Sequence, residues 1–183
     1  MKRSRCLLTP TLLFLLLASE PAAAQKGKPL TGAFDPEQVL VNLEQTVKER
    51  DWRRYGDFLA EDFRFIPFDS VPLEHPAVEW DEWGHAREIR FIEELVSPNF
   101  GAVLELRDNV LDRGIESHGR AEWDILYSLT TRGQVFRSRA VFVFEKVDNL
   151  WYLREWIDTT IETDEESGAA FSTSGSLRVV LSR

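Results

Sequence analysis

The spacing of the hydrophobic residues changes once along the chain, near Ala102. Before this residue, apolar side chains recur three and four positions apart, which is typical of helices with one buried face. After it, apolar and polar residues alternate, which is typical of β-strands. Helices followed by a run of strands predict an α+β domain, in which an antiparallel sheet packs against helices.

The first half of the chain predicts three helices. Asp35 and Pro36 mark the start of the first, because aspartate is a good N-cap and proline is tolerated at the first helical position. Asp51 is expected to cap a second, short helix, and Asp81 is expected to cap a third. Residues 63–68 (FRFIPF) are expected to form a strand between the second and third helices.

The second half predicts four strands separated by turns. Arg132-Gly133 and Asp148-Asn149 are dipeptides typical of hairpin turns. Leu177–Leu181 is expected either to add an edge strand or to remain loose. The four expected strands are Ala102–Leu111, Arg120–Thr130, Val135–Val147 and Trp151–Thr159.

The first residues have the features of a secretory signal peptide. MKRSR is basic, Leu12–Ala18 is an unbroken apolar run, and Ala22 and Ala24 suit a signal peptidase. The run is shorter than the roughly 20 apolar residues that span a bilayer. We therefore expect residues 1–24 to be a signal peptide, 25–33 a linker, 34–160 the domain and 161–183 an acidic tail rich in small residues. The mature chain is expected to be exported, to the periplasm or the extracellular medium, and not to bind membranes.

Composition narrows the classes of partner. The only cysteine, Cys6, lies in the predicted signal peptide, so the mature chain can form no disulfide and no cysteine-ligated metal site. The net charge is -9, and removal of the signal peptide makes it more negative, which disfavours nucleic acid as a partner. His75, His85 and His118 are scattered, and no calcium-loop spacing is present, so neither a metal nor a cofactor is expected.

Three stretches carry a resemblance to a known superfamily. They are Asp51–Phe65 (DWRRYGDFLAEDFRF), the third expected helix, and Asp148–Thr159 (DNLWYLREWIDT). Together they resemble the NTF2-like superfamily, which includes SnoaL-type cyclases, ketosteroid isomerases and scytalone dehydratase. The resemblance covers Phe34 to about Thr160. It implies a cone, in which a strongly curved antiparallel sheet folds around the N-terminal helices, with a pocket at the wide end and a homodimer formed through the sheet.

The residues support one part of this picture and exclude another. Ala140–Phe144 (AVFVF) is apolar at both parities, which predicts a strand buried on both faces. Aligning the chain with ketosteroid isomerase without gaps from Asp51 puts the catalytic base at Pro67 and the tyrosine at Leu43. Neither side chain can perform that chemistry.

The last predicted hairpin carries the strongest candidate site. If Asp148-Asn149 closes a two-residue turn, counting outward pairs Arg139 with Asp158 and places both on one face. The resemblance to ketosteroid isomerase makes this face the pocket side, and SnoaL-type cyclases use an aspartate as their acid–base group, so Asp158 with Arg139 is the catalytic candidate. The face would also hold Val141, Val143, Arg154 and Trp156.

A second interpretation of the same hairpin stays open. The opposite face is more apolar and could equally cover the helices, in which case Arg139 and Asp158 form an ordinary cross-strand ion pair worth about 0.2–1 kcal/mol. The residues of that face are Phe142, Phe144, Trp151, Leu153 and Ile157.

Three functions are compatible with the sequence. The first is binding of a small apolar or anionic organic molecule in the cone. The second is an SnoaL-like lyase, isomerase or cyclase that uses Asp158 with Arg139. The third is a protein-interaction module of the cell envelope, which would need a large exposed apolar patch outside the dimer interface. The predicted ligand contacts are Trp156, Trp123, Arg154, Val141 and Phe65.

Overall fold

The computed structural model of the chain describes residues 32–114, 116–132, 134–161 and 174–181. The predicted signal peptide, most of the predicted linker and residues 162–173 of the predicted tail lie outside these ranges. The helices are α1 (Pro36–Glu49), α2 (Trp52–Gly56), α3 (Ser70–Glu74), η1 (Trp80–Glu82), α4 (His85–Leu95), η2 (Arg107–Asn109) and α5 (Ser174–Leu181). The strands are β1 (Leu59–Ile66), β2 (Val103–Glu105), β3 (Val110–Arg113), β4 (Arg120–Thr131), β5 (Gln134–Val147) and β6 (Leu150–Ile161).

The first two helices begin where the sequence predicts. The Asp35 carboxylate accepts a hydrogen bond from the Gln38 backbone N–H at 2.7 Å, with Pro36 in the first helical position. The Asp51 carboxylate accepts one from the Arg54 backbone N–H at 3.2 Å. Both carboxylates satisfy N–H groups that have no partner inside their helices.

The third predicted helix, α4, begins after Asp81. The backbone of Trp83–Gly84 is bound to β1, because the Trp83 carbonyl accepts from the Phe65 N–H at 2.9 Å and Gly84 bridges Arg64. These residues therefore cannot join the helix, which starts at His85, and Asp81 lies in the short 3-10 helix η1.

The six strands form one curved sheet in the order β1-β6-β5-β4-β2, with β3 also paired to β4. β1 runs parallel to β6, so the sheet is mixed; the predicted antiparallel pairing holds for the other strand pairs and is wrong only for β1. The single strand predicted over 102–111 is broken, because the Glu44 carboxylate accepts hydrogen bonds from the backbone N–H groups of Leu106 and Arg107 at 2.6 and 2.8 Å.

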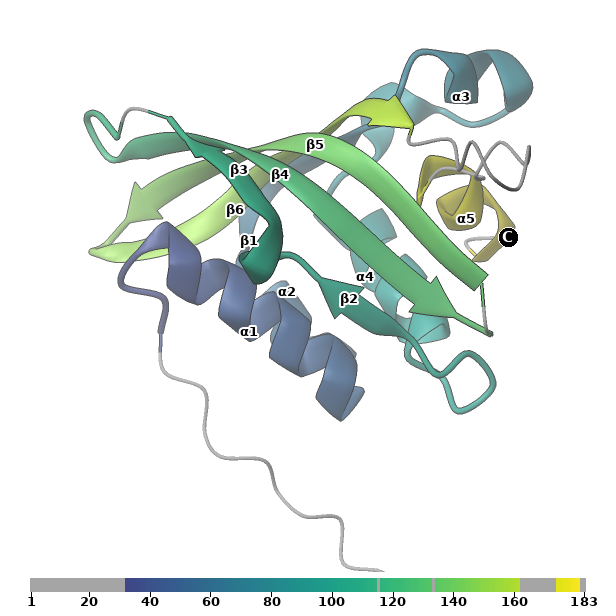
Figure 1. Ribbon diagram of the computed structural model, residues 1–183, viewed down its shortest axis with the longest axis horizontal. Coiled ribbons are helices and arrows are strands. Elements are labelled where there is room, and N and C mark those ends of the chain that lie inside the picture. The colour runs from purple at the N-terminus through teal and green to yellow at the C-terminus, as the bar shows by residue number, and fades with distance from the viewer. Residues whose placement is uncertain (1–31, 115, 133, 162–173, 182–183) are drawn as a thin grey trace, which may run out of the picture.

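The sheet curves around the helices, and its inner face builds the core (Figure 1). β4 and β5 alternate between buried inward side chains and more exposed outward ones along most of their length. The inward side chains pack against the apolar faces of α1 and α4. Those of β4 and β5 are Ala121, Trp123, Ile125, Tyr127, Leu129, Phe136, Ser138, Ala140, Phe142 and Phe144.

Two β-bulges decide which side chains of the last hairpin face inward. The turn itself is confirmed: Val147 pairs with Leu150, and Asp148 and Asn149 have positive φ angles of 51° and 68°. Further out, the pairs Phe144–Leu153 and Val143–Glu155 leave Arg154 as an extra residue of β6. A second shift pairs Ala140 with Asp158 and Arg139 with Thr160.

The first bulge switches the parity of β6. Trp151 and Leu153 point inward before it, and Trp156 and Asp158 point inward after it, so residues that the sequence placed on opposite faces share one face. The predicted pairing of Arg139 with Asp158 is therefore wrong.

Residues 174–181 form the helix α5, and the expected alternatives for Leu177–Leu181, an edge strand or a loose end, are both wrong. α5 packs against α4 and β5 at one end of the sheet (Figure 1). Its inward side chains are Ser174, Leu177, Arg178 and Leu181. No helix within the described ranges is both long and apolar enough to cross a membrane.

Candidate functional site

Charged and polar side chains meet inside the cone, between the sheet and α4. We call the group Glu88, Tyr127, Asp158, Ser174 and Arg178 the buried polar cluster. Glu88 comes from α4, Tyr127 from β4, Asp158 from β6, and the other two from α5. Glu88, Asp158 and Arg178 are 0%, 4% and 1% exposed. Charged groups are almost never buried to this degree unless they are paired, so each of these side chains needs a buried partner.

Arg178 and Glu88 form a two-pronged ion pair. Arg178 Nε donates to Glu88 Oε2 at 2.9 Å, and Nη2 donates to Oε1 at 2.7 Å. The Trp83 indole Nε1 donates to the same Oε2 at 2.9 Å. Both carboxylate oxygens thus face the flat edge of a guanidinium, which is the geometry that distinguishes an arginine-type group from a simple ammonium.

Aromatic rings surround the same guanidinium. Arg178 Cζ lies 3.7 Å from the ring centre of Phe65, 4.7 Å from that of Phe91 and 4.8 Å from that of Trp156. A cation held over ring faces in a site without water gains about 2 kcal/mol or more from each favourable contact. The guanidinium is therefore held by charge on its edge and by π-electron density on its faces.

The Asp158 carboxylate is the second acid of the cluster. Its Oδ1 accepts hydrogen bonds from Tyr127 Oη at 2.8 Å and Trp156 Nε1 at 2.9 Å, and its Oδ2 accepts from Ser174 Oγ at 2.9 Å. Arg178 Nη1 donates to Ser174 Oγ at 2.8 Å. Ser174 thus links Arg178 to Asp158. Ser174 and Arg178 both belong to α5.

The surroundings change how these groups bind protons. Burial raises the pKa of Asp158, and the charge of Arg178 and the hydrogen bonds from Tyr127, Ser174 and Trp156 oppose the rise only in part. Burial also raises the pKa of Tyr127 well above its ordinary value, so this phenol stays protonated. For Arg178, burial favours the neutral form, but the charge and hydrogen bonds of Glu88 outweigh it and the pKa rises. When Asp158 is protonated, the ion pair of Arg178 and Glu88 leaves the cluster neutral.

Two buried polar atoms, Tyr55 Oη and Trp80 Nε1, have no hydrogen-bonding partner among the described residues. The Tyr55 hydroxyl from α2 is buried, and no atom of the described residues lies in hydrogen-bonding position to it. Burial raises the pKa of Tyr55 well above its ordinary value, and the nearby charge of Glu88 adds to this rise. A buried hydroxyl without a hydrogen bond costs about 1–3 kcal/mol, so a partner for this atom would stabilise the protein.

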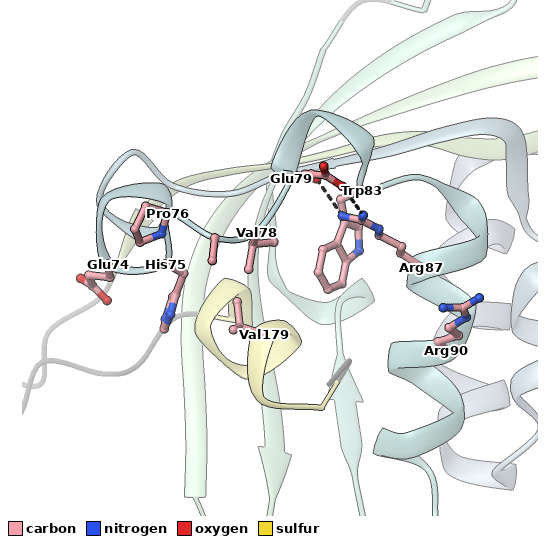
Figure 2. Close-up of a pocket in the computed structure, with 10 residues that line it drawn as sticks. Glu74, His75, Pro76, Val78, Glu79, Trp83, Arg87, Arg90 and Val179 are labelled. Carbon is pink, nitrogen blue, oxygen red and sulfur yellow. Dashed lines mark hydrogen bonds and ion pairs between the residues drawn. The ribbon is translucent and has the colours of Figure 1, made fainter.

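The interior is closed in this arrangement, and a larger hollow lies outside it. The remaining cavity beside Tyr55, Glu88 and Arg178 measures about 10 Å³, which holds at most one water molecule. The outer hollow measures about 550 Å³. Figure 2 shows Trp83, Arg87 and Arg90 on one side of it and Val179 of α5 on another. Trp83 borders the outer hollow, and its indole N–H donates to Glu88, which lines the inner cavity.

The structure divides the predicted site residues into two groups. Asp158, Trp156 and Phe65 lie inside the cone and belong to or border the buried polar cluster. Trp123 also faces inward, but it lies four residues along β4 from Tyr127 and packs against Phe144 and Arg113.

The other predicted residues lie on the outer face of the sheet. Arg139 forms an ion pair with Asp124, whose pKa the hydrogen bond from Arg139 lowers. Arg154 forms ion pairs with Asp62 and Glu145 at 2.8 and 3.2 Å. Val141 faces outward beside Asp124. None of these three side chains reaches Asp158, so the predicted partnership of Asp158 with Arg139 does not form.

Sequence reasoning missed Glu88, Tyr127, Ser174 and Arg178. Glu88 did carry a signal, because it stands three, four and seven residues before Phe91, Ile92 and Leu95 and so lies on the buried stripe of α4. Arg178 stands three residues before Leu181, again on an apolar stripe. A charged residue at a position reserved for apolar ones indicates a buried partner. Among the described residues, no group of acidic, histidine or cysteine side chains is placed to hold a metal ion.

Comparison with protein families and with curated proteins finds no match for this chain. Solved structures do resemble it. A domain of unknown function with a cystatin-like fold from Nostoc punctiforme has a TM-score of 0.53 at 14% identity, covering 72% of this chain and 78% of that one. An NTF-2 like protein of unknown function from Shewanella oneidensis has a TM-score of 0.51 at 13% identity, covering 67% and 94%.

A further structure, an NTF2-like protein of unknown function from Pseudomonas putida, has a TM-score of 0.50 at 15% identity, covering 74% of this chain and 90% of that one. At such identities the likeness concerns the fold alone. The mixed, curved sheet around the helices is consistent with the likeness to these three structures. The chain therefore has the NTF2-like α+β fold.

Proposed function

We propose that the mature chain is an exported NTF2-like domain that binds a small organic molecule inside its cone. One observation carries the proposal: the cone already holds a flat organic group, the guanidinium of Arg178, between a carboxylate and three aromatic rings. The group differs from a free ligand only in its attachment to α5. The Tyr55 hydroxyl, which has no partner among the described residues, supports the same proposal.

The tryptophans provide the test. The indole N–H groups of Trp83 and Trp156 donate into the buried polar cluster, so their NMR signals should move when a molecule enters the cone. Trp52 and Trp151 are internal controls, because they contact Arg53 and Lys146 instead. The probes are benzamidine, benzamide and benzoate, which share one shape and carry positive, zero and negative charge.

The titration is done on the wild-type mature chain and on Arg178→Ala, in which the occupant of the site is shortened. The proposal expects at least one probe to shift Trp83 and Trp156 saturably in one of the two proteins, with Trp52 and Trp151 unchanged. If no probe moves either cluster tryptophan in either protein, small-ligand binding in the cone is refuted.

Export is tested separately. The full chain, expressed in a bacterium, should appear outside the cytoplasm. Its mass should be that of a chain that begins at Gln25. A chain that stays in the cytoplasm with residues 1–24 attached would overturn this part of the proposal.

A second candidate is an acid–base enzyme of the lyase, isomerase or cyclase type. The observation that favours it is the raised pKa of the buried Asp158 carboxyl beside the Tyr127 hydroxyl. Arg139 takes no part, because it lies outside the cone. Asp158→Asn should then abolish turnover of a bound substrate and leave its binding intact, whereas unchanged turnover would exclude the role.

A further inference from the structure

The chemistry of the cone interior selects one class of ligand. We propose that the site takes a small organic cation with a guanidinium or amidinium group, and that Arg178 is an internal competitor for it. This inference rests on the proposed function, and it adds the charge of the ligand and the means by which the site is closed.

The buried charge of Glu88 favours a cationic ligand. Glu88 is fully buried and is held by Arg178 through two hydrogen bonds and by Trp83 through one. A neutral or anionic ligand that displaced Arg178 would leave this carboxylate without a counter-charge in an apolar site, which is strongly unfavourable. A cation that replaces the guanidinium keeps the same pairing.

The geometry around the Arg178 guanidinium favours a flat ligand group. The two oxygens of Glu88 accept from two different nitrogens of Arg178, and Phe65 lies against the face of the guanidinium at 3.7 Å. Two parallel N–H donors on a flat group satisfy both features, and a rounded ammonium satisfies only the charge. The site therefore favours guanidinium and amidinium over alkylammonium ions.

Displacement of α5 would remove several hydrogen bonds from the buried polar cluster at once. Ser174 and Arg178 belong to the same helix, so its displacement removes both guanidinium hydrogen bonds from Glu88, whose Oε2 keeps the one from Trp83, and it also removes the hydrogen bond from Ser174 to Asp158 Oδ2. Asp158 Oδ1 keeps Tyr127 and Trp156. The opened site would offer acceptors on two walls and the Tyr55 hydroxyl on a third.

The docking of α5 is expected to be reversible. α5 has 8 residues, and a helix of that length is marginal in water without tertiary contacts. The mature chain contains no cysteine, so no disulfide fixes α5 to the cone. The helix is therefore held by its docking contacts, which include the buried Leu177 and Leu181 as well as Arg178, and a competing cation can replace those of Arg178. A competitor of this kind lowers the apparent affinity for the ligand by the factor by which the closed state outweighs the open one.

The test is chemical rescue of the full mature chain. Arg178→Ala removes the guanidinium, and ethylguanidinium at millimolar concentration is added back; ethylurea, which is neutral and has nearly the same shape, is the control. We expect Arg178→Ala to bind ethylguanidinium about tenfold or more tightly than the wild type by calorimetry, with shifts of the Trp83 and Trp156 indole signals. Ethylurea should bind neither protein measurably. If the alanine variant does not fold alone, millimolar ethylguanidinium should restore its folding and ethylurea should not, and rescue by both or by neither would overturn the inference.

The outcomes separate the two proposals. Equal binding of ethylguanidinium and ethylurea, equal affinity of wild type and variant for ethylguanidinium, or no binding of ethylguanidinium would each overturn the cation inference. If benzamide or benzoate still shifts the cluster tryptophans in that case, the proposed function stands without it. Glu88→Gln added to Arg178→Ala should remove the preference for the cation, and a preference that survives would also overturn the inference.

Discussion

Neutralising Glu88 tests whether the buried polar cluster is held by paired charge. Glu88→Gln keeps the size of the side chain but removes the charge opposite Arg178, which is 1% exposed. Removing one partner of a buried ion pair costs about 3–5 kcal/mol, because the other charge stays in an apolar site. For a domain of this size, that loss lowers the melting temperature by roughly 6–20 °C.

A surface pair provides the matched control. Arg113 and Glu37 are also 2.7 Å apart, but their side chains are 55% and 46% exposed. Glu37→Gln should therefore change the free energy of unfolding by no more than about 1 kcal/mol. Equal N–O distance with unequal burial isolates the contribution of desolvation.

The double variant completes the experiment. Glu88→Gln with Arg178→Met removes both charges and fills the space with an apolar chain, so it should be no less stable than either single variant. The coupling energy from urea unfolding should then be about 2 kcal/mol or more. The cluster is not held by the paired charges if Glu88→Gln changes the free energy of unfolding no more than Glu37→Gln does. The same conclusion follows if the effects of Glu88→Gln and Arg178→Met on this free energy are additive.

Four further predictions concern other residues. Burial raises the pKa of Asp158, so the contribution of this carboxyl to stability is present below the ordinary carboxyl pKa of about 3.9 and falls as the pH rises toward the raised value. Unfolding of Asp158→Asn, measured as a function of pH, should lack this dependence. The hydrogen bond from Arg139 lowers the pKa of Asp124, so Asp124→Asn should instead remove stability that is present above pH 4 and lost on acidification, and slopes of equal sign would contradict both assignments. Tyr127→Phe should destabilise the fold by about 1–3 kcal/mol in urea, because it removes a donor to the buried Asp158, and an unchanged stability would show that this bond contributes nothing. Asn149→Val should cost about 1–2 kcal/mol, because φ is 68° there, while Asn149→Gly should be tolerated, and the reverse order of melting temperatures would contradict the turn geometry.

Local signals in the sequence were sufficient for most of the fold. Asp35 and Asp51 cap their helices because capping depends on the residue and its immediate neighbours. Asp81 failed as a cap because residues 83–84 pair with β1, which no local pattern shows. The parallel pairing of β1 with β6 was missed for the same reason, since it joins segments far apart in the chain.

The candidate site was predictable only in part. Asp158 and Trp156 lie inside the cone, as one of the two interpretations of the last hairpin expected, although the register behind that interpretation was wrong. Regular alternation cannot show a bulge, and the bulge at Arg154 decides the parity of everything after it. Arg178 lies 90 residues from Glu88, so only the folded structure brings the pair together.

The extra residue at Arg154 also affects how this chain should be aligned with related sequences. A comparison that runs through β6 without a gap will match the inward residues of one chain with the outward residues of another on one side of the bulge. Relatives whose strand lacks this residue should be aligned with a one-residue gap at Arg154, which keeps Trp151 and Leu153 in their columns and moves Trp156 and Asp158 by one. With that gap, residues that line the interior of proteins with the NTF2-like fold can be compared directly with those of this chain.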